Sequence, residues 1–287
     1  MADAAPADLV ITITDPIKND TGALNSFISY KVNTETTLDA FADKQFSVIR
    51  RYSQFEWLRE YLRFKLPGVI VPPLPEKALT GRFVPEFIEG RRRALERFMG
   101  RCGEHPFIRE DETFRLFLSA DEDKLSKAKA ELKKEQASSG GSFFGSLTAA
   151  TSPLEKVKSE EDLKVEEVAA YVANLDAQMQ NVAKHTAALM KRGKELSQGL
   201  FDFGLAFTML GQHETEALNG ALSSMGHTAD QLSLVAADQV EKETRWFEEP
   251  IGDYIQLLGA VKEAVDRRNQ VGPRYALGRQ AKSRNQV

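Results

Sequence analysis

The sequence contains few of the residues that build disulfides, metal sites and catalytic centres. Among its 287 residues are 1 cysteine and 4 histidines. Cys102 therefore has no internal partner, and the scattered histidines lack the spacing of a zinc site. Neither an activated Ser/Cys/His set nor a Gly-rich phosphate loop ending in Lys-Ser/Thr occurs. We therefore expect a protein that is not an enzyme and that uses no metal or cofactor.

Strong net charge and long apolar runs are also missing. The net charge of -4 provides no overall attraction to nucleic acid or anionic lipid, so phosphate recognition would require local clusters. Residues 1–8 lack the basic and apolar parts of a secretory signal. The most apolar window, 199–211, is too short to span a bilayer. The sequence predicts a cytoplasmic protein without a nucleic-acid partner, whose membrane contact is peripheral.

The first half of the sequence predicts an α+β domain. Short strands with alternating apolar residues are expected at Leu9–Thr14, Ser26–Val32 and Phe46–Arg50, forming a three-stranded meander. Ser53 and Glu56 have capping-box spacing, which predicts a helix that starts there and ends by Pro67. Further helices are expected from Pro85 and from Glu112.

The second half has a helical period and predicts an elongated, all-α coiled coil. Apolar residues recur at alternating steps of three and four, which predicts a single seam that closes at Gly211. A second helix is expected after a short turn, bent at Pro250 and interrupted at Gly272-Pro273. The seam comprises Val165, Val168, Val172, Leu175, Met179, Val182, Thr186, Leu189, Gly193, Leu196, Leu200, Phe203, Phe207 and Leu210.

Composition suggests how the chain is divided. We expect a disordered N-terminus at 1–7, the α+β domain at 8–120, a charged helix and Ser/Gly-rich linker at 121–153, and the helical domain at 154–287. Phe143, Phe144 and Leu147 lie in the linker near several lysines. They could form an amphipathic helix on a membrane surface, or belong to a disordered linker with a few exposed apolar residues.

Two adjacent arginines precede a tyrosine at the end of the third expected strand. Because side chains alternate along a strand, Arg50 and Arg51 cannot point the same way, and one of them can face a ligand. The planar guanidinium can donate two hydrogen bonds to one phosphate. Beside Tyr52 the pair therefore suggests a phosphate site, although an isolated arginine pair at a strand end is more often simply solvated.

Three separated motifs resemble, in order and spacing, the signature of a PX (phox-homology) domain. They are Arg51-Tyr52, the proline loop 72–77 and the arginine-rich stretch 91–98. PX domains bind phosphatidylinositol 3-phosphate. The resemblance implies that Arg51 pairs with the 3-phosphate, Tyr52 packs against the inositol ring, Lys77 contacts the 1-phosphate and Arg91 contacts the ring hydroxyls. Arg50 is a further phosphoinositide-binding candidate.

The segment after the proline loop is a candidate for membrane insertion. The PX resemblance implies that Leu79 and Phe83 dip into the bilayer beside the lipid site. The alternative is that they are core residues of the following helix. Phe143, Phe144 and Leu147 complete the set of insertion candidates.

The second half resembles the BAR domain of a sorting nexin, on the stretches 194–197, 209–211, 246–255 and 261–268. Together the two halves resemble the retromer-associated PX-BAR sorting nexins. A BAR domain has three helices, and this sequence is expected to end soon after the second. The missing helix would leave the dimer surface incomplete.

The resemblance implies a phosphatidylinositol 3-phosphate-binding protein, peripheral on early endosome membranes, that acts in endosomal sorting and retrograde transport. Its BAR-type region would sense curvature as a homodimer or as a heterodimer with another sorting nexin, and retromer subunits are possible partners. The alternative is a coiled-coil scaffold whose PX-like half binds protein partners, because Pro72–Pro75 also satisfies the P-x-x-P pattern of SH3 ligands.

Overall fold

The computed structural model describes residues 8–20, 26–77, 83–138 and 160–284. The chain divides into two compact units, residues 1–165 with 263–287, and residues 166–262. The expected disordered N-terminus at 1–7 lies outside the described residues, as do the insertion candidates Leu79, Phe143, Phe144 and Leu147. None of the described helices is both long and apolar enough to cross a bilayer.

The three expected strands are confirmed. β1 (Leu9–Asn19), β2 (Phe27–Thr36) and β3 (Gln45–Arg51) form an antiparallel sheet in the order β1-β2-β3. Their register places Tyr30 opposite Arg50. Alternate residues of β1 are buried, because successive side chains of a strand point to opposite faces. The sheet thus presents one apolar face to the helices.

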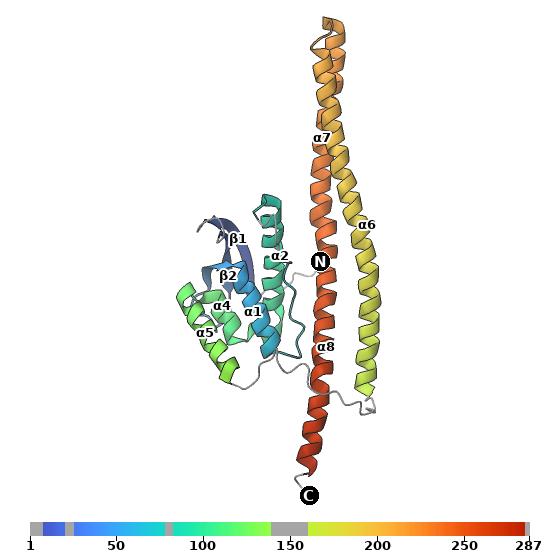
Figure 1. The fold of residues 1–287 in the computed structure, drawn as a ribbon. Coiled ribbons are helices and arrows are strands. Elements are labelled where there is room, and N and C mark those ends of the chain that lie inside the picture. The colour runs from blue at the N-terminus through green and yellow to red at the C-terminus, as the bar shows by residue number, and fades with distance from the viewer. Residues whose placement is uncertain (1–7, 21–25, 78–82, 139–159, 285–287) are drawn as a thin grey trace. The chain divides into compact units, whose positions relative to one another are not determined.

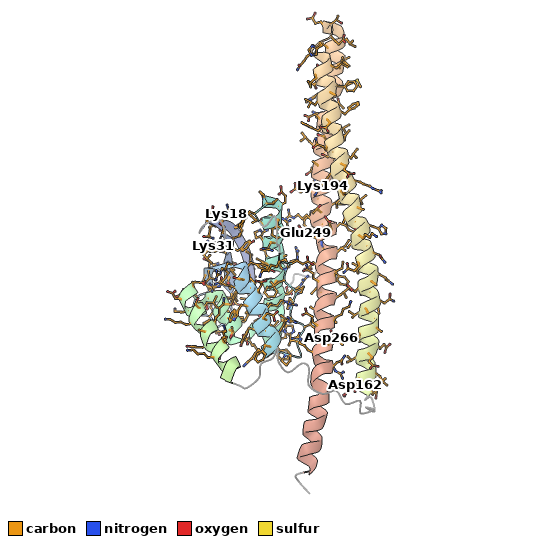
Figure 2. The ribbon with its side chains drawn as sticks, viewed as in Figure 1. Lys18, Lys31, Asp162, Lys194, Glu249 and Asp266 are labelled. Atoms are coloured by element: carbon orange, nitrogen blue, oxygen red, sulfur yellow. The ribbon has the colours of Figure 1, made fainter. Side chains whose placement is uncertain are left out.

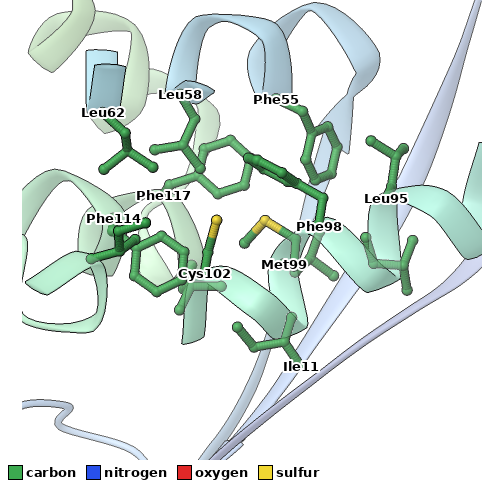
Figure 3. Packing of buried hydrophobic residues seen from close by; sticks show 14 of the residues in the cluster. Ile11, Phe55, Leu58, Leu62, Leu95, Phe98, Met99, Cys102, Phe114 and Phe117 are labelled. Carbon is green, nitrogen blue, oxygen red and sulfur yellow. The ribbon is translucent and has the colours of Figure 1, made fainter. Parts of the chain in front are cut away.

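Within the described residues 52–77 and 83–138, five helices follow the sheet and enclose the core with it. They are α1 (Tyr52–Lys65), α2 (Pro85–Glu104), α3 (Pro106–Arg109), α4 (Glu112–Ser119) and α5 (Glu122–Ser138). Figure 1 labels α1, α2, α4 and α5 beside the sheet. α2 contacts β1, and both α1 and α4 contact β3. The buried side chains between them include Phe55, Leu58, Leu95, Phe98, Met99, Phe114 and Phe117 (Figure 3). Cys102 belongs to this core, and burial raises the pKa of its thiol above the usual range.

The predicted capping role of Ser53 is wrong. α1 begins one residue earlier, at Tyr52, because β3 continues into it without a loop and Arg51 occupies the N-cap position. The side chain of Gln54 accepts a hydrogen bond from the Arg51 backbone N–H at 2.8 Å, as the third residue of a capping box does. Gln54 also donates to Glu122 of α5, so the start of α1 is fixed from two sides.

The proline-rich segment between α1 and α2 forms neither helix nor strand over its described residues 69–77. Val71, Pro72 and Pro73 are buried, and the Pro72 carbonyl accepts a hydrogen bond from Nε of Arg59 on α1 at 3.0 Å. The segment is therefore packed against its own domain and carries Lys77 at its described end.

The second unit is built from antiparallel helices. α6 (Glu160–Gly211) ends at the predicted glycine, and α7 (Glu216–Glu243) returns after a short turn. A π-helix, η1 (Thr244–Glu248), then leads into α8 (Glu249–Arg284). Side chains project along the outer surfaces of these helices, as Figure 2 shows.

The prediction of one apolar seam is only partly correct. Every seventh residue from Val165 to Phe207 is buried or half-buried in the hairpin, as expected. The predicted seam has a second residue in each seven-residue repeat, from Val168 to Leu210. In the structure the residue that faces the hairpin is the next one along the chain, namely Ala169, Asp176, Ala183, Met190, Ser197, Gly204 and Gly211. Most of these residues are small, which brings the helices close together. The large residues predicted for that position face outward instead, namely Val168, Val182, Leu189, Leu196, Phe203 and Leu210.

Glycine makes the closest approach between α6 and α7 possible. A Cβ atom at Gly226 would lie 2.8 Å from the carbonyl oxygen of Gly204, and one at Gly204 would lie 2.8 Å from that of Gly226. Two helical turns away, Ser197 donates a hydrogen bond to the Ser233 carbonyl at 2.9 Å, so a backbone carbonyl also takes part in the contact between the helices. Side chains larger than hydrogen at these glycines would force the helices apart.

Two prolines lie within the long helices after α7 begins, and the backbone remains helical at both. Before Pro250 the backbone forms the π-helix η1, which adapts the hydrogen-bond ladder to the missing N–H donor. The expected interruption at Gly272-Pro273 is wrong, because α8 continues to Arg284. A proline disfavours the helical conformation of the preceding residue partly because its ring clashes with that residue's Cβ atom. Gly272 has no Cβ atom, so this clash is absent.

We expect Gly226→Ala to lower the free energy of unfolding by about 1–3 kcal/mol, because the added methyl group overpacks the crossing. Gly220→Ala is the matched control on the same helix, since a Cβ there meets nothing within 4 Å. It should raise stability by about 0.5–1 kcal/mol through helix propensity. Urea unfolding followed by circular dichroism measures both, and equal stabilisation by the two variants would contradict the close crossing.

Candidate anion-binding site

The end of β3 and the start of α1 place three consecutive side chains in different environments. Arg50 is almost fully buried, Arg51 is exposed and Tyr52 is half-buried. The alternation of side chains along β3 produces the difference between the arginines. Of the two arginines, Arg51 is therefore the one accessible to a ligand from solvent.

Arg50 is held by backbone carbonyls at the end of α4. Its Nε and Nη2 donate to the Phe117 carbonyl at 3.0 and 2.7 Å, and Nη2 also donates to the Ala120 carbonyl. The last carbonyls of a helix lack partners within the helix, and Arg50 supplies donors for them. Burial lowers the pKa of Arg50 to about 10, while Glu122 and Asp121 oppose that effect. Arg50 thus belongs to the core, where its donors are already bound to backbone carbonyls.

Tyr52 and Arg91 join the start of α1 to α2 and to the proline loop. The guanidinium carbon of Arg91 lies 4.2 Å from the ring centroid of Tyr52 and 4.4 Å from that of Phe87. Arg91 also donates to the Glu76 carbonyl at 2.9 Å, and the Tyr52 hydroxyl donates to the Pro75 carbonyl. Cation–π contacts with two rings hold the guanidinium in place.

Burial strongly affects the electrostatics around Arg91. It lowers the pKa of Arg91, while Tyr30, Tyr52 and Glu56 favour the charged form. It raises the pKa of the nearby Tyr30 to about 12. The buried Nε of Arg91 has no hydrogen-bond acceptor among the described residues. A buried donor without an acceptor is costly, so this nitrogen adds a destabilising contribution at the junction of α1 and α2.

Lys77 and Arg51 supply the remaining positive charge. Nζ of Lys77 lies 3.4 Å from a carboxylate oxygen of Glu56 on α1, and the lysine side chain is mostly exposed. The guanidinium of Arg51 lies 5.7 Å from the ring centroid of Phe27 on β2. We call Arg51, Tyr52, Lys77 and Arg91 the basic cluster. Tyr52 and Arg91 are in direct contact. Lys77 is connected to them through Glu56 of α1 and through the proline loop, whose Glu76 carbonyl binds Arg91. Arg51 belongs to the cluster because it precedes Tyr52 in the chain.

The other arginines of the 91–93 run have different roles. Arg92 donates to the Ile13 carbonyl of β1 at 2.6 Å and pairs with Glu89 and Glu96 at 2.8 and 2.9 Å. It therefore ties α2 to the sheet, and Arg93 pairs with Glu89 at 3.4 Å. Sequence spacing alone does not reveal this difference, which depends on the side of α2 that faces the sheet.

Of the predicted insertion residues, Phe83 is within the described part of the chain. It is half-buried, precedes the exposed Val84, and has Nζ of Lys18 on β1 at 5.1 Å from its ring centroid. Figure 2 labels Lys18 and Lys31 on the sheet. The described ranges contain no group of three or more His, Cys, Asp or Glu side chains placed to hold a metal ion.

Sequence comparison shows which known families share this architecture. Residues 38–121 match the PX domain family and residues 140–286 match the family described as Vps5 C terminal like. Sorting nexin 1 of Arabidopsis thaliana is 35% identical over 91% of this chain and 66% of its own length. Sorting nexin-1 of Homo sapiens is 33% identical over 93% of this chain and 53% of its own length. The chain thus spans about half to two thirds of these relatives.

A comparison of structures gives the same architecture. The cryo-EM structure of the SNX-BAR Mvp1 tetramer matches with a TM-score of 0.69 over 96% of this chain and 77% of that one. The sequence identity is 18%, so this match concerns the fold. It covers both the sheet-containing part and the long helices.

Substitution of the two adjacent arginines should affect stability very unequally. We expect Arg50→Leu to lower the free energy of unfolding by about 2–4 kcal/mol, because buried carbonyls of α4 lose charged donors. Arg51→Leu, at an exposed position, should change it by less than about 0.5 kcal/mol. Thermal unfolding of the full chain measures both, and similar losses in the two variants would contradict the assigned role of Arg50.

Proposed function

Because the chain belongs to the PX-BAR sorting nexins, we propose that it is a peripheral membrane protein that binds phosphatidylinositol 3-phosphate on early endosomes. Arg51 pairs with the 3-phosphate, Tyr52 packs against the inositol ring, Lys77 contacts the 1-phosphate and Arg91 contacts the ring hydroxyls. The family acts in membrane trafficking, and this chain would act in endosomal sorting and retrograde transport, with retromer subunits as partners and without enzymatic activity.

The observation that carries the proposal is the fixed guanidinium of Arg91 between Tyr52 and Phe87. A fixed cation is pre-organised for an anionic ligand, since less conformational freedom is lost on binding. The exposed Arg51 adds donors suited to phosphate oxygens. The three sequence motifs of the resemblance thus supply a charged site with an aromatic wall.

Membrane insertion would accompany headgroup binding. Phe83 and Leu79 follow the loop that carries Lys77, and Lys18 beside Phe83 adds a cation for the lipid surface. Phe143, Phe144 and Leu147 would add an amphipathic segment. We propose these contacts from position in the chain and from the geometry at Phe83.

The rival function, a scaffold that offers its P-x-x-P loop to an SH3 domain, is disfavoured by burial. Pro72 and Pro73 are buried against their own domain, and the Pro72 carbonyl already accepts a hydrogen bond from Arg59. An SH3 domain binds prolines that are exposed on an extended ligand. The loop would have to leave the core to bind in this way.

The lipid proposal predicts a selective loss of binding on substitution of Arg51. Arg51→Ala should reduce sedimentation with phosphatidylcholine vesicles containing phosphatidylinositol 3-phosphate by about tenfold or more, because a charge-assisted phosphate contact is removed. Lys65→Ala, at the exposed C-terminal end of α1, removes the same charge and is the control. Equal binding of Arg51→Ala and wild type, or no preference of wild type for the 3-phosphate lipid, would refute the proposal.

The outward-facing residues of α6 support BAR-type dimerisation. Leu189, Leu196, Phe203 and Leu210 recur every seven residues and are each about half exposed within the single chain. A stripe of this length on one helix is an incomplete coiled-coil interface. We propose that it packs against a second sorting nexin chain, identical or related, and that the dimer senses curvature.

We expect Leu196→Glu to weaken self-association by about tenfold or more, because it places a charge in the centre of an apolar interface. Gln180→Glu is the control, because it introduces the same charge on the other side of α6. Gln180 is two residues from the outward-facing Val182, a rotation of about 200° around the helix. Sedimentation equilibrium measures both. If the two variants associate equally, the outward stripe is not the dimer interface.

A further inference from the structure

Glu56 introduces a carboxylate into the basic cluster. It lies on α1 four residues after Tyr52, so the two side chains share one face of the helix. One of its oxygens is 3.4 Å from Nζ of Lys77. The Glu56 side chain is 31% exposed and the Lys77 side chain 69% exposed. The carboxylate of Glu56 on α1 is therefore paired with Lys77, whose side chain extends from the proline loop into solvent.

The charge of Glu56 reaches other members of the cluster. Burial raises the pKa of Tyr52, and Glu56 adds to that shift. The same carboxylate favours the charged form of Arg91 against the effect of burial. A phosphate that approached Tyr52, Lys77 and Arg91 would therefore meet a like charge in their midst.

We propose that Glu56 is an internal competitor of the ligand, which holds Lys77 in the unliganded protein and must release it when a phosphate binds. The proposal rests on the proposed phosphoinositide function and adds a residue that limits its affinity. A contact present only in the free protein weakens binding by its own strength. One site would thus hold one headgroup weakly, and lasting attachment would require a second contact with the membrane.

The Glu56–Lys77 pair contributes little to folding. Ion pairs between exposed side chains add little to stability, and Lys77 is the more exposed partner. Neutralising Glu56 should therefore leave the domain folded. This separates its effect on binding from an effect on stability.

The first test is Glu56→Gln, with binding to phosphatidylcholine vesicles containing phosphatidylinositol 3-phosphate as the measurement. We expect the variant to bind about two- to fivefold more tightly than wild type, the range that exposed ion pairs produce. Glu60→Gln is the matched control, because Glu60 lies one turn further along α1 and pairs with Arg63 at 2.7 Å. It should bind as wild type does.

The second test repeats Glu56→Gln in a Lys77→Met background. If Glu56 acts by holding Lys77, most of the gain disappears there, whereas general charge removal would preserve it. A preserved gain, or equal binding of Glu56→Gln and Glu60→Gln, overturns the inference while the lipid function stands. Failure of wild type to prefer the 3-phosphate lipid overturns both.

Discussion

The buried guanidinium of Arg50 fixes the junction on which the basic cluster depends. Its hydrogen bonds to the Phe117 and Ala120 carbonyls tie the end of β3 to the end of α4. With Arg50 turned inward, the alternation of the strand directs Arg51 outward. Because α1 begins at the next residue, Tyr52 has a defined position against Arg91. The positions of Arg51 and Tyr52 are therefore set by the packing of the core, as expected for a binding site built on rigid elements.

Much of the first domain could be predicted from the sequence, because its signals are local. Alternating apolar residues identify the strands, and Pro85 marks the start of α2, where its fixed φ and missing donor are tolerated. The roles of Arg50 and Arg91–Arg93 could not be predicted in this way. Arg50 finds its acceptor 67 positions away, and Arg92 finds one on β1. Residue type and spacing do not specify such partners.

The helical unit shows a second limit of sequence patterns. A repeat of three and four steps fits two registers that differ by one residue, and hydrophobicity favours the one rich in leucine and phenylalanine. The hairpin uses the other register, in which Gly204 and Ser197 of α6 face α7. These small residues, together with Gly226 of α7, permit close backbone contact. Small residues contribute little to hydrophobicity but allow tight packing. The large residues consequently lie on the exposed side of α6. They were wrongly predicted to face the hairpin, and they form the proposed dimer surface.

The two proposed binding surfaces would together produce reversible attachment to a membrane. A cluster in which Glu56 competes for Lys77 cannot bind one headgroup as tightly as its cations alone would allow. Pairing through the outward residues of α6 would connect two such sites, and linked sites can gain about 10² to 10⁴ in avidity. Attachment would then respond steeply to lipid density and to the concentration of the partner chain. A site optimised for single-headgroup affinity would lose that dependence, because one contact would already be sufficient for attachment.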